Sequence, residues 1–246
     1  MRNICRKIYK KLKLYASINW IKTLYINCKF FPISEALQFP IIVFGACSFK
    51  SLKGKLNVHI PIQTGIITFG HKFEIFTKEA GISEVFLEGN WELYGKIQFG
   101  YDFKLYIEKE ATFQHGNWCS FANNTRLVCS NSVILGDNVK IGDFSHCVDT
   151  NFHDLIDLET QTNLPKKGSI KIGSNVNIGA NSMIMRNTIL PNYSMVGSMS
   201  LCNKDYTPFG EHNFYAGIPA RLVRENYGRD WEKEQKDVEE FLTIRL

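Results

Sequence analysis

The sequence predicts an all-β solenoid, a parallel β-helix built from six-residue units. Steps of six from Leu87 to Cys147 meet an apolar residue at nine of eleven positions. The period resumes out of phase at Ile172 and runs to Cys202 with an apolar residue at all six positions. In this second series a small or β-branched residue, as at Val176, follows four places after each aliphatic one. Such a short fixed period is typical of repeat architectures.

The period of six excludes the commoner alternatives. An α-helix cannot keep this period on one face, because its 3.6 residues per turn drift around the axis. A meander of antiparallel strands would show a period of two with hairpin turns between the strands. In a parallel β-helix each unit supplies one short strand with its aliphatic residue inward. Stacked coils then bury an apolar column that no single coil could bury.

The chain divides into four predicted segments. Residues 1–38 form a basic helical segment, and residues 39–84 form a region of short strands between glycines. Residues 85–205 form the β-helix, which a polar loop interrupts at 148–170. Residues 206–246 form an exit segment and a C-terminal helix that begins after Asp230. Because loops on a rigid scaffold often carry function, the inserted loop is the first place to look for chemistry.

Charge is distributed unevenly along the chain. The net charge is +5, but residues 1–34 hold eight of the 29 Lys and Arg residues and no Asp or Glu. This concentration at one end does not predict a nucleic-acid-binding face. The first 30 residues fit either a basic helix on an anionic membrane surface or a helix packed on the main domain. With no apolar run long enough to span a bilayer and no signal peptide, we expect a cytoplasmic protein, with peripheral contact at the inner membrane face as an option.

Metal and disulfide chemistry are not expected. The seven cysteines are odd in number, and no two have C-x-x-C spacing. Among the six histidines only His146 and His153 lie close in sequence, so three imidazoles for a zinc site are not in evidence.

The segment Ile172–Asp205 and the following AGIPARLVRE, Ala216–Glu225, resemble the left-handed β-helix, or hexapeptide-repeat, acyltransferases. Within that family the resemblance is best to O-acetyltransferases of bacterial polysaccharides. It is strong over residues 130–225 and limited to the period over 85–130. It implies a homotrimer with active sites between subunits, and acetyl-CoA as the acyl donor. The chain departs from many relatives at Asn177, where they have an aromatic residue.

The resemblance places the catalytic base in the inserted loop, at His153. Imidazole suits this task because its ordinary pKa of about 6.5 allows it to take and return a proton near neutral pH. We favour Asp149 as the carboxylate that orients the ring, with Asp154 and Asp157 as alternatives. His146 is the rival base and a candidate substrate contact.

The resemblance also implies contacts for both substrates. Backbone at Ala180 and Ser198 would line the pantetheine arm of CoA, and Lys204 and Arg221 would bind its phosphates. Asn123 and Asn124 are candidates for the acceptor, because a carboxamide both donates and accepts hydrogen bonds. A self-satisfied ladder of asparagines is the structural alternative for these two residues.

The expected activity is therefore direct acetyl transfer from acetyl-CoA to a sugar hydroxyl of a bacterial surface polysaccharide or its precursor. A sugar-nucleotide N-acetyltransferase is one alternative, although the Gly-rich phosphate loop of a nucleotide-binding βαβ unit is not evident here. A β-helix scaffold that binds without catalysis is another.

Overall fold

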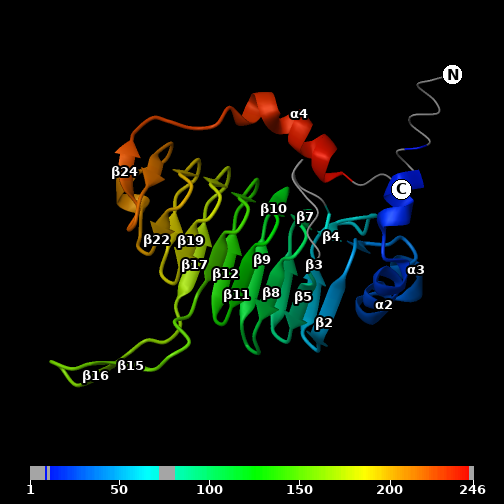
Figure 1. The fold of residues 1–246 in the computed structure, drawn as a ribbon, viewed down its shortest axis with the longest axis horizontal. Coiled ribbons are helices and arrows are strands. Elements are labelled where there is room, and N and C mark those ends of the chain that lie inside the picture. Colours follow the sequence, from blue (N-terminus) through cyan, green and yellow to red (C-terminus); the bar gives the residue numbers. More distant parts are fainter. Residues whose placement is uncertain (1–8, 10–11, 72–80, 244–246) are drawn as a thin grey trace.

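The computed structural model describes residue 9, residues 12–71 and residues 81–243, and the segments 1–8, 10–11, 72–80 and 244–246 lie outside the described part. Three parallel sheets wrap around one core, and the chain visits them in turn (Figure 1). The coils follow one another along the solenoid from the N-terminal helices to the C-terminal exit strands, as the sequence predicts.

The first sheet contains β1 (Ile41–Val43), β4 (Ile67–Phe69), β7 (Ile97–Phe99), β10 (Cys119–Phe121), β13 (Lys140–Ile141), β18 (Asn177–Ile178), β21 (Met195–Val196), β23 (Phe214–Ala216) and β24 (Arg221–Arg224). The second contains β2 (Cys47–Leu52), β5 (Ser83–Leu87), β8 (Lys104–Ile107), β11 (Arg126–Cys129), β14 (His146–Val148), β19 (Met183–Met185) and β22 (Leu201–Cys202). The third contains β3 (Lys55–Val58), β6 (Asn90–Leu93), β9 (Thr112–His115), β12 (Ser132–Leu135), β17 (Ser169–Ile172) and β20 (Ile189–Leu190).

The solenoid begins earlier than residue 85. Strands β1 to β4, from the region 39–84, pair in parallel within the same three sheets. Strand pairing therefore does not follow the boundary expected at residue 85. The period of six was hidden in this region because its coils carry bulges and longer turns, as between Phe49 and Ser51.

Helices, a hairpin and a short turn decorate the coils. Helices α2 (Trp20–Phe30) and α3 (Ile33–Ala36) lie at the N-terminal end, and residues 12–17 are also helical. An antiparallel hairpin, β15 (Leu155–Asp157) and β16 (Thr162–Leu164), projects from the coils, and a short 3-10 turn, η1 (Thr207–Phe209), follows the last full coil. Helix α4 (Trp231–Leu242) lies along the solenoid, and Asp230 caps it by accepting from the Lys233 N–H at 3.1 Å.

Within the described residues, no helix is both long and apolar enough to cross a membrane.

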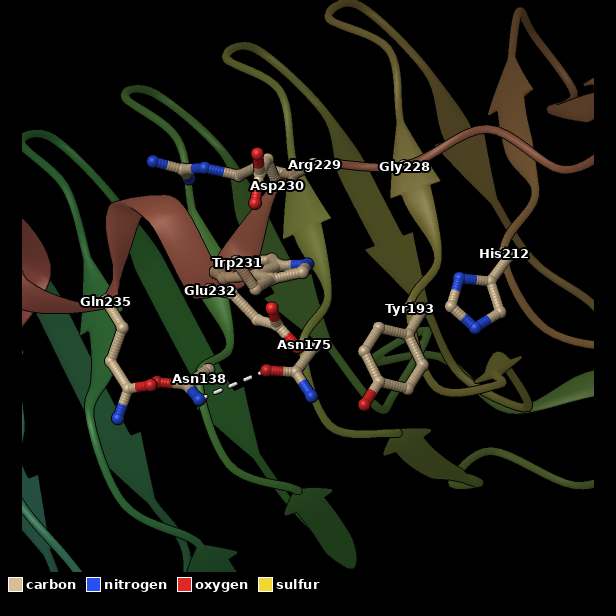
Figure 2. Close-up of a pocket in the computed structure, with 10 residues that line it drawn as sticks. All are labelled: Asn138, Asn175, Tyr193, His212, Gly228, Arg229, Asp230, Trp231, Glu232 and Gln235. Atoms are coloured by element: carbon tan, nitrogen blue, oxygen red, sulfur yellow. Dashed lines mark hydrogen bonds between the residues drawn. The ribbon is translucent and has the colours of Figure 1, made fainter.

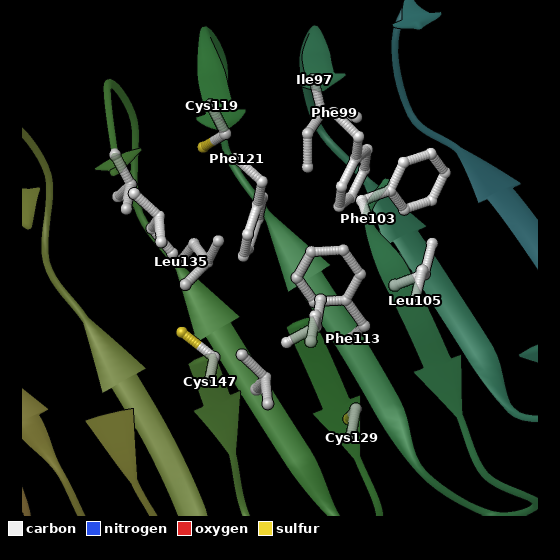
Figure 3. Packing of buried hydrophobic residues seen from close by; sticks show 14 of the residues in the cluster. Ile97, Phe99, Phe103, Leu105, Phe113, Cys119, Phe121, Cys129, Leu135 and Cys147 are labelled. Atoms are coloured by element: carbon white, nitrogen blue, oxygen red, sulfur yellow. The ribbon is translucent and has the colours of Figure 1, made fainter. Parts of the chain in front are cut away.

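The core is one continuous apolar column. Phe99 stacks on Phe121 of the next coil with ring centroids 4.9 Å apart, and Phe103 lies 5.1 Å from Phe99 (Figure 3). Aliphatic residues and cysteines continue the column toward the C-terminal coils. Because each inward side chain is covered by the coils on either side, removal of one coil would expose its neighbours.

The spacing of inward residues in the first series differs from the expected register. Strands β7, β8, β9 and β10 end at Phe99, Ile107, His115 and Phe121, which gives spacings of eight, eight and six residues. All four are buried. A uniform step of six therefore does not follow the inward positions in this region. It reaches Asn117 and Asn123, the two polar exceptions, which do not lie at the inward strand ends. His115 is inward instead.

One of the positions that looks variable in the sequence has a fixed backbone role. Three residues after the inward aliphatic, the backbone turns the corner with a positive φ, as at Asn175, Asn181 and Asn187 (φ 57°, 58° and 67°). Left-handed backbone is costly for most L-residues and least so for Asn and Asp, whose short side chains bond locally. The three asparagines are therefore corner residues.

His115 makes a testable prediction about stability and pH. Burial lowers its pKa to about 4, and its Nε2 atom has no hydrogen-bond partner among the described residues. The unfolded chain takes up this proton near pH 6.5, whereas the folded chain does so only near pH 4, so stability is lost as the pH falls between these values. We expect the loss to approach roughly 3 kcal/mol.

The measurement is denaturant unfolding at several pH values. His115→Phe, which keeps an aromatic ring at this buried position, should remove this part of the acid-induced loss. Equal pH profiles for wild type and His115→Phe would contradict the prediction.

Candidate functional site

The inserted loop forms an arm that is tied to the coils only at its root. Thr150 and Lys167 form an antiparallel bridge there, and the Asn151 N–H donates to the Lys166 carbonyl at 3.1 Å. Beyond the root the chain continues into the β15–β16 hairpin (Figure 1). His153 lies just outside the root with an exposed side chain, and it forms no hydrogen bond or ion pair with any described residue. Its imidazole is therefore accessible to a second molecule.

Asp149 fastens the arm to the turn of the preceding coil. Its carboxylate is buried and accepts from the N–H groups of Ser130, Asn131 and Ser132 at 2.7, 2.8 and 2.9 Å. Burial raises the pKa of Asp149, and the three amides oppose that rise. Both oxygens are thus engaged in holding the turn, which gives Asp149 a structural role. That it orients His153 stays a prediction without a contact to support it.

The two alternative carboxylates have positions of their own. Asp154 is almost fully exposed and lies 3.9 Å from the Lys166 ammonium. Asp157 accepts from the backbone of Glu159 and Thr160, both at 2.9 Å, and thereby closes the hairpin turn. Neither contacts His153.

Asn151 is a feature of the loop that the sequence did not single out. Both polar atoms of its side chain are buried and lack a partner among the described residues. A buried carboxamide without partners is costly unless a ligand, a water molecule or another subunit satisfies it. The only sequence signal is its place two residues before His153.

His146, the rival base, lies on β14 in the second sheet. It is half-buried and faces Arg126 of β11 in register. Burial lowers the pKa of His146, and the charge of Arg126 lowers it further, so the imidazole is neutral at physiological pH. A neutral imidazole can accept a proton or bind a hydroxyl.

Ala180 and Ser198 lie one above the other, at the edge where the first sheet turns into the second. The Gly179 N–H donates to the Val196 carbonyl at 2.8 Å, which sets the two coils in register. A side chain at Gly179 would come within 2.5 Å of the Ser198 nitrogen, so only glycine fits there. The two coils are therefore closely stacked at this edge, and contact of Ala180 and Ser198 with the pantetheine arm stays a prediction.

Asn123 and Asn124 lie on the same first–second edge, two coils earlier. Asn123 is buried, its Oδ1 accepts from the Tyr101 N–H at 3.2 Å, and its own N–H donates to Asp143 at 2.7 Å. Asn124 turns the corner with φ 56°. These two bonds of Asn123 are made with Tyr101 and Asp143 and not with another asparagine. Contact of Asn123 or Asn124 with a sugar stays a prediction.

Lys204 and Arg221, the expected phosphate contacts, are both exposed. Lys204 lies at the edge between the second and third sheets, where its carbonyl accepts from the Ile189 N–H at 3.1 Å. Its ammonium lies over the rings of Tyr206 and Phe209, 5.3 and 5.6 Å from their centroids. Arg221 begins β24 in the exit segment.

The expected site residues therefore fall on two edges of one chain. The arm with His153, and Lys204 beyond it, lie on the second–third edge, whereas Ala180 and Ser198 lie on the first–second edge. The second sheet, which carries His146, separates the two edges. No hydrogen bond or ion pair among the described residues joins the two groups. One chain does not assemble them into a single site.

A groove of about 600 Å³ between the first sheet and α4 reaches the edge at Ala180. Lys140 on its floor donates to the Trp118 carbonyl, and burial lowers the pKa of Lys140 to about 8. Arg229 enters from the other side, where its Nη1 donates to the Asn177 Oδ1 at 3.0 Å. The departure at Asn177 thus has a structural reason, because a carboxamide there holds the segment that leads into α4.

A second hollow opens where the third sheet turns into the first (Figure 2). Corner residues line it, and Asn138 Nδ2 donates to Asn175 Oδ1 at 3.1 Å. The rings of Tyr193 and His212 stack with centroids 4.3 Å apart. The start of α4 at Trp231 closes the hollow.

Among the described residues no group of three or more His, Cys, Asp or Glu side chains is placed to hold a metal ion.

The chain is similar to known acetyltransferases. It is 26% identical to galactoside O-acetyltransferase of Escherichia coli K12 over 191 residues, 76% of this chain and 85% of that protein. The structure of NeuO, a polySia-specific acetyltransferase, aligns over 82% of this chain and 86% of that one, with TM-score 0.50 and 14% identity. Galactoside acetyltransferase in complex with coenzyme A aligns over 57% of this chain and 61% of that one, with TM-score 0.36 and 25% identity. No family model matches the chain.

The chain resembles the left-handed β-helix, hexapeptide-repeat acyltransferases in its repeat, its three-sided parallel fold and its similarity to an acetyltransferase over most of its length. The predicted fold class and enzyme class are thereby confirmed.

The role of Asp149 can be tested by stability. Asp149→Ala leaves three N–H groups at a buried turn without their acceptor, so the free energy of unfolding should fall by about 3 kcal/mol. Chemical denaturation measures this directly. Asp154→Ala, which removes an exposed carboxylate from the same loop, should change stability by less than about 0.5 kcal/mol. An Asp149→Ala protein of wild-type stability that has lost activity would instead make Asp149 the orienting carboxylate.

Proposed function

We propose that the protein transfers an acetyl group from acetyl-CoA to a hydroxyl of a bacterial surface polysaccharide or its precursor, with His153 as general base. The observation that carries the proposal is the exposed imidazole of His153, which lies on an arm that projects from the coils and forms no hydrogen bond or ion pair with a described residue. The similarity to a galactoside O-acetyltransferase over most of both chains supports a sugar hydroxyl as the acceptor.

The chemistry follows from these groups. A ring nitrogen of His153 takes the proton of the acceptor hydroxyl as its oxygen attacks the thioester carbonyl. The new C–O bond forms, the C–S bond breaks, and the imidazolium returns the proton to the departing CoA sulfur. The unpartnered Asn151 carboxamide is proposed to contact the acceptor or the acetyl carbonyl from the same root of the arm.

The donor would lie along the first–second edge. Backbone at Ala180 and Ser198 suits a narrow pantetheine chain, because both residues have small side chains. Lys204 and Arg221 are proposed to meet the phosphates, where charge-assisted hydrogen bonds are strongest. Since Lys204 and His153 lie on the other edge, they would reach this donor from a neighbouring subunit.

A homotrimer would bring the two edges together. In a cyclic assembly the second–third edge of each subunit meets the first–second edge of the next, and three equivalent sites result. The proposal therefore includes a closed trimer with acceptor and donor held at each of its boundaries, and a cytoplasmic location where acetyl-CoA is available.

The identity of the base has a direct test. His153→Ala should lower kcat/KM roughly 10²–10⁴-fold because the hydroxyl loses its proton acceptor. Stability should be unchanged, since the side chain is exposed and forms no hydrogen bond or ion pair with a described residue. The assay is release of CoA thiol from acetyl-CoA in the presence of a panel of sugars and amino sugars.

His146→Ala serves as the matched variant in that assay. Full activity of His153→Ala together with loss in His146→Ala would move the base to β14. A preference for amino sugars, with acetyl appearing on nitrogen, would establish the N-acetyltransferase alternative. No thiol release with any acceptor, and no thermal stabilisation by acetyl-CoA, would favour a scaffold without catalysis.

Sharing of the site between subunits predicts complementation. Ser198→Trp should block the donor edge, and His153→Ala should remove the base, so each variant alone is inactive. In mixed trimers a site is active where a subunit with intact His153 meets a neighbour with intact Ser198. In an equal mixture this holds for about a quarter of the sites, because each residue is intact in half of the subunits. Co-expression followed by the thiol assay measures this. Mixed trimers as inactive as either parent would place both groups in a site within one chain.

A further inference from the structure

Helix α2 has an inverted distribution of polar and apolar side chains. The residues that it buries against the coils include Thr23 and Asn27, together with Ile26. Its exposed face carries Trp20, Ile21, Leu24, Tyr25 and Cys28. A helix on the surface of a globular protein normally turns its apolar stripe to the core and its polar residues to water. The outward face of α2 therefore requires an explanation.

The buried polar residues are explained by the end of the β-helix. Strand β1 is the terminal strand of the first sheet, so one side of it has no neighbouring strand. Thr23 Oγ1 accepts from the Val43 N–H at 3.0 Å. Asn27 Oδ1 accepts from the Ile41 N–H at 2.9 Å, and its Nδ2 donates to the Ile41 carbonyl at 2.6 Å. Thr23 and Asn27 thus complete β1, and Ile26 packs into the core beside them, so the remaining apolar residues on the outward face of α2 are left exposed.

Several exposed apolar residues gather on the two helices at this end of the molecule. Ile21 is 82% exposed, Leu24 47% and Tyr25 57%, and a shallow hollow lies among them. Ile33 (74%) and Leu37 (60%), at the two ends of α3, extend the surface. We call these five residues the end surface. An apolar surface of this size on one end of a protein marks an interaction site.

The charge beside the end surface selects its partner. Lys29 flanks the hollow, and Lys22 lies over the Phe49 ring at 5.2 Å. Residues 1–34 contain eight Lys and Arg residues, and the first acidic residue of the chain is Glu35. Apolar side chains bordered by cations, with Trp20 and Tyr25 at the margin, match the boundary between anionic headgroups and acyl chains. A protein partner or a second copy would not require so one-sided a charge.

We propose that the end surface docks on an anionic lipid bilayer. Ile21, Leu24 and Tyr25 enter the headgroup region, and the lysines of this end contact the lipid phosphates. The coils then stand away from the membrane, with the arm near the opposite end (Figure 1). This attachment does not depend on the proposed acetyl transfer, and its test needs no turnover.

The test is co-sedimentation of the full-length protein with vesicles of phosphatidylcholine alone and of phosphatidylcholine mixed with phosphatidylglycerol. Wild type should bind the anionic vesicles and release as salt is raised, because the surface potential is screened. Ile21→Glu and Leu24→Glu should each weaken binding about tenfold or more, and Lys29→Gln about fivefold. All three positions are exposed, so the fold should be retained, as circular dichroism and thermal melting would show.

Leu158→Glu is the matched control, because Leu158 is 77% exposed on the hairpin, far from the end surface. It should bind vesicles as wild type does. Equal binding by Ile21→Glu and wild type would overturn the proposal, as would equal binding to neutral and anionic vesicles. A lipid-free assembly that dissociates only when Ile21 or Leu24 is changed would assign the surface to a contact between copies and likewise overturn it.

Discussion

The structure depends on hydrogen bonds between successive coils, because the strands of the three sheets pair in parallel register with those of the next coil, apart from the antiparallel pair β23–β24 at the exit. Backbone bonds such as Gly136 N–H to the Ile172 carbonyl at 2.8 Å recur along the solenoid. This pairing requires coils of similar shape, with one inward residue per side and a tight corner after it. The hexapeptide pattern is the sequence expression of that requirement. A coil can depart from it only where the extra residues leave the stack, as the arm does.

The same constraint decides where chemistry can occur. Inward positions are filled by the column, and strand positions on the faces are short and repetitive, so reactive groups gather at edges and on insertions. Here the edges carry different groups: glycine-rich backbone on one, and an imidazole and cations on another. A three-sided repeat with distinct edges is suited to cyclic assembly. Each boundary between subunits would join two unlike edges, so the groups of both edges would meet in one site. Assembly and catalysis would then share one set of contacts.

Much of the fold could be predicted from the sequence, because period and residue size report directly on stacking. In the structure the second series of hexads supplies β17 to β22, the arm leaves the stack between β14 and β17, and α4 follows Asp230. The register of the first series was harder to predict. The strand ends at Phe99, Ile107 and His115 are eight residues apart, so a uniform step of six loses the inward positions in this region. Asp149 could not be assigned from sequence, because its three amide partners lie on another coil. The exposed apolar face of α2 could not be predicted either, because it depends on which side of the helix packs on β1, and the sequence does not give that side.

The anchoring of the arm also has a consequence for how such a protein can diversify. Asp149 and the Thr150–Lys167 bridge secure the root, and the hairpin beyond them contributes no strand to the stack. Residues 155–164 can therefore be lengthened, shortened or replaced while the scaffold keeps its shape. Acceptor preference could change through this one exchangeable segment, independently of the parts that determine folding and hold the donor.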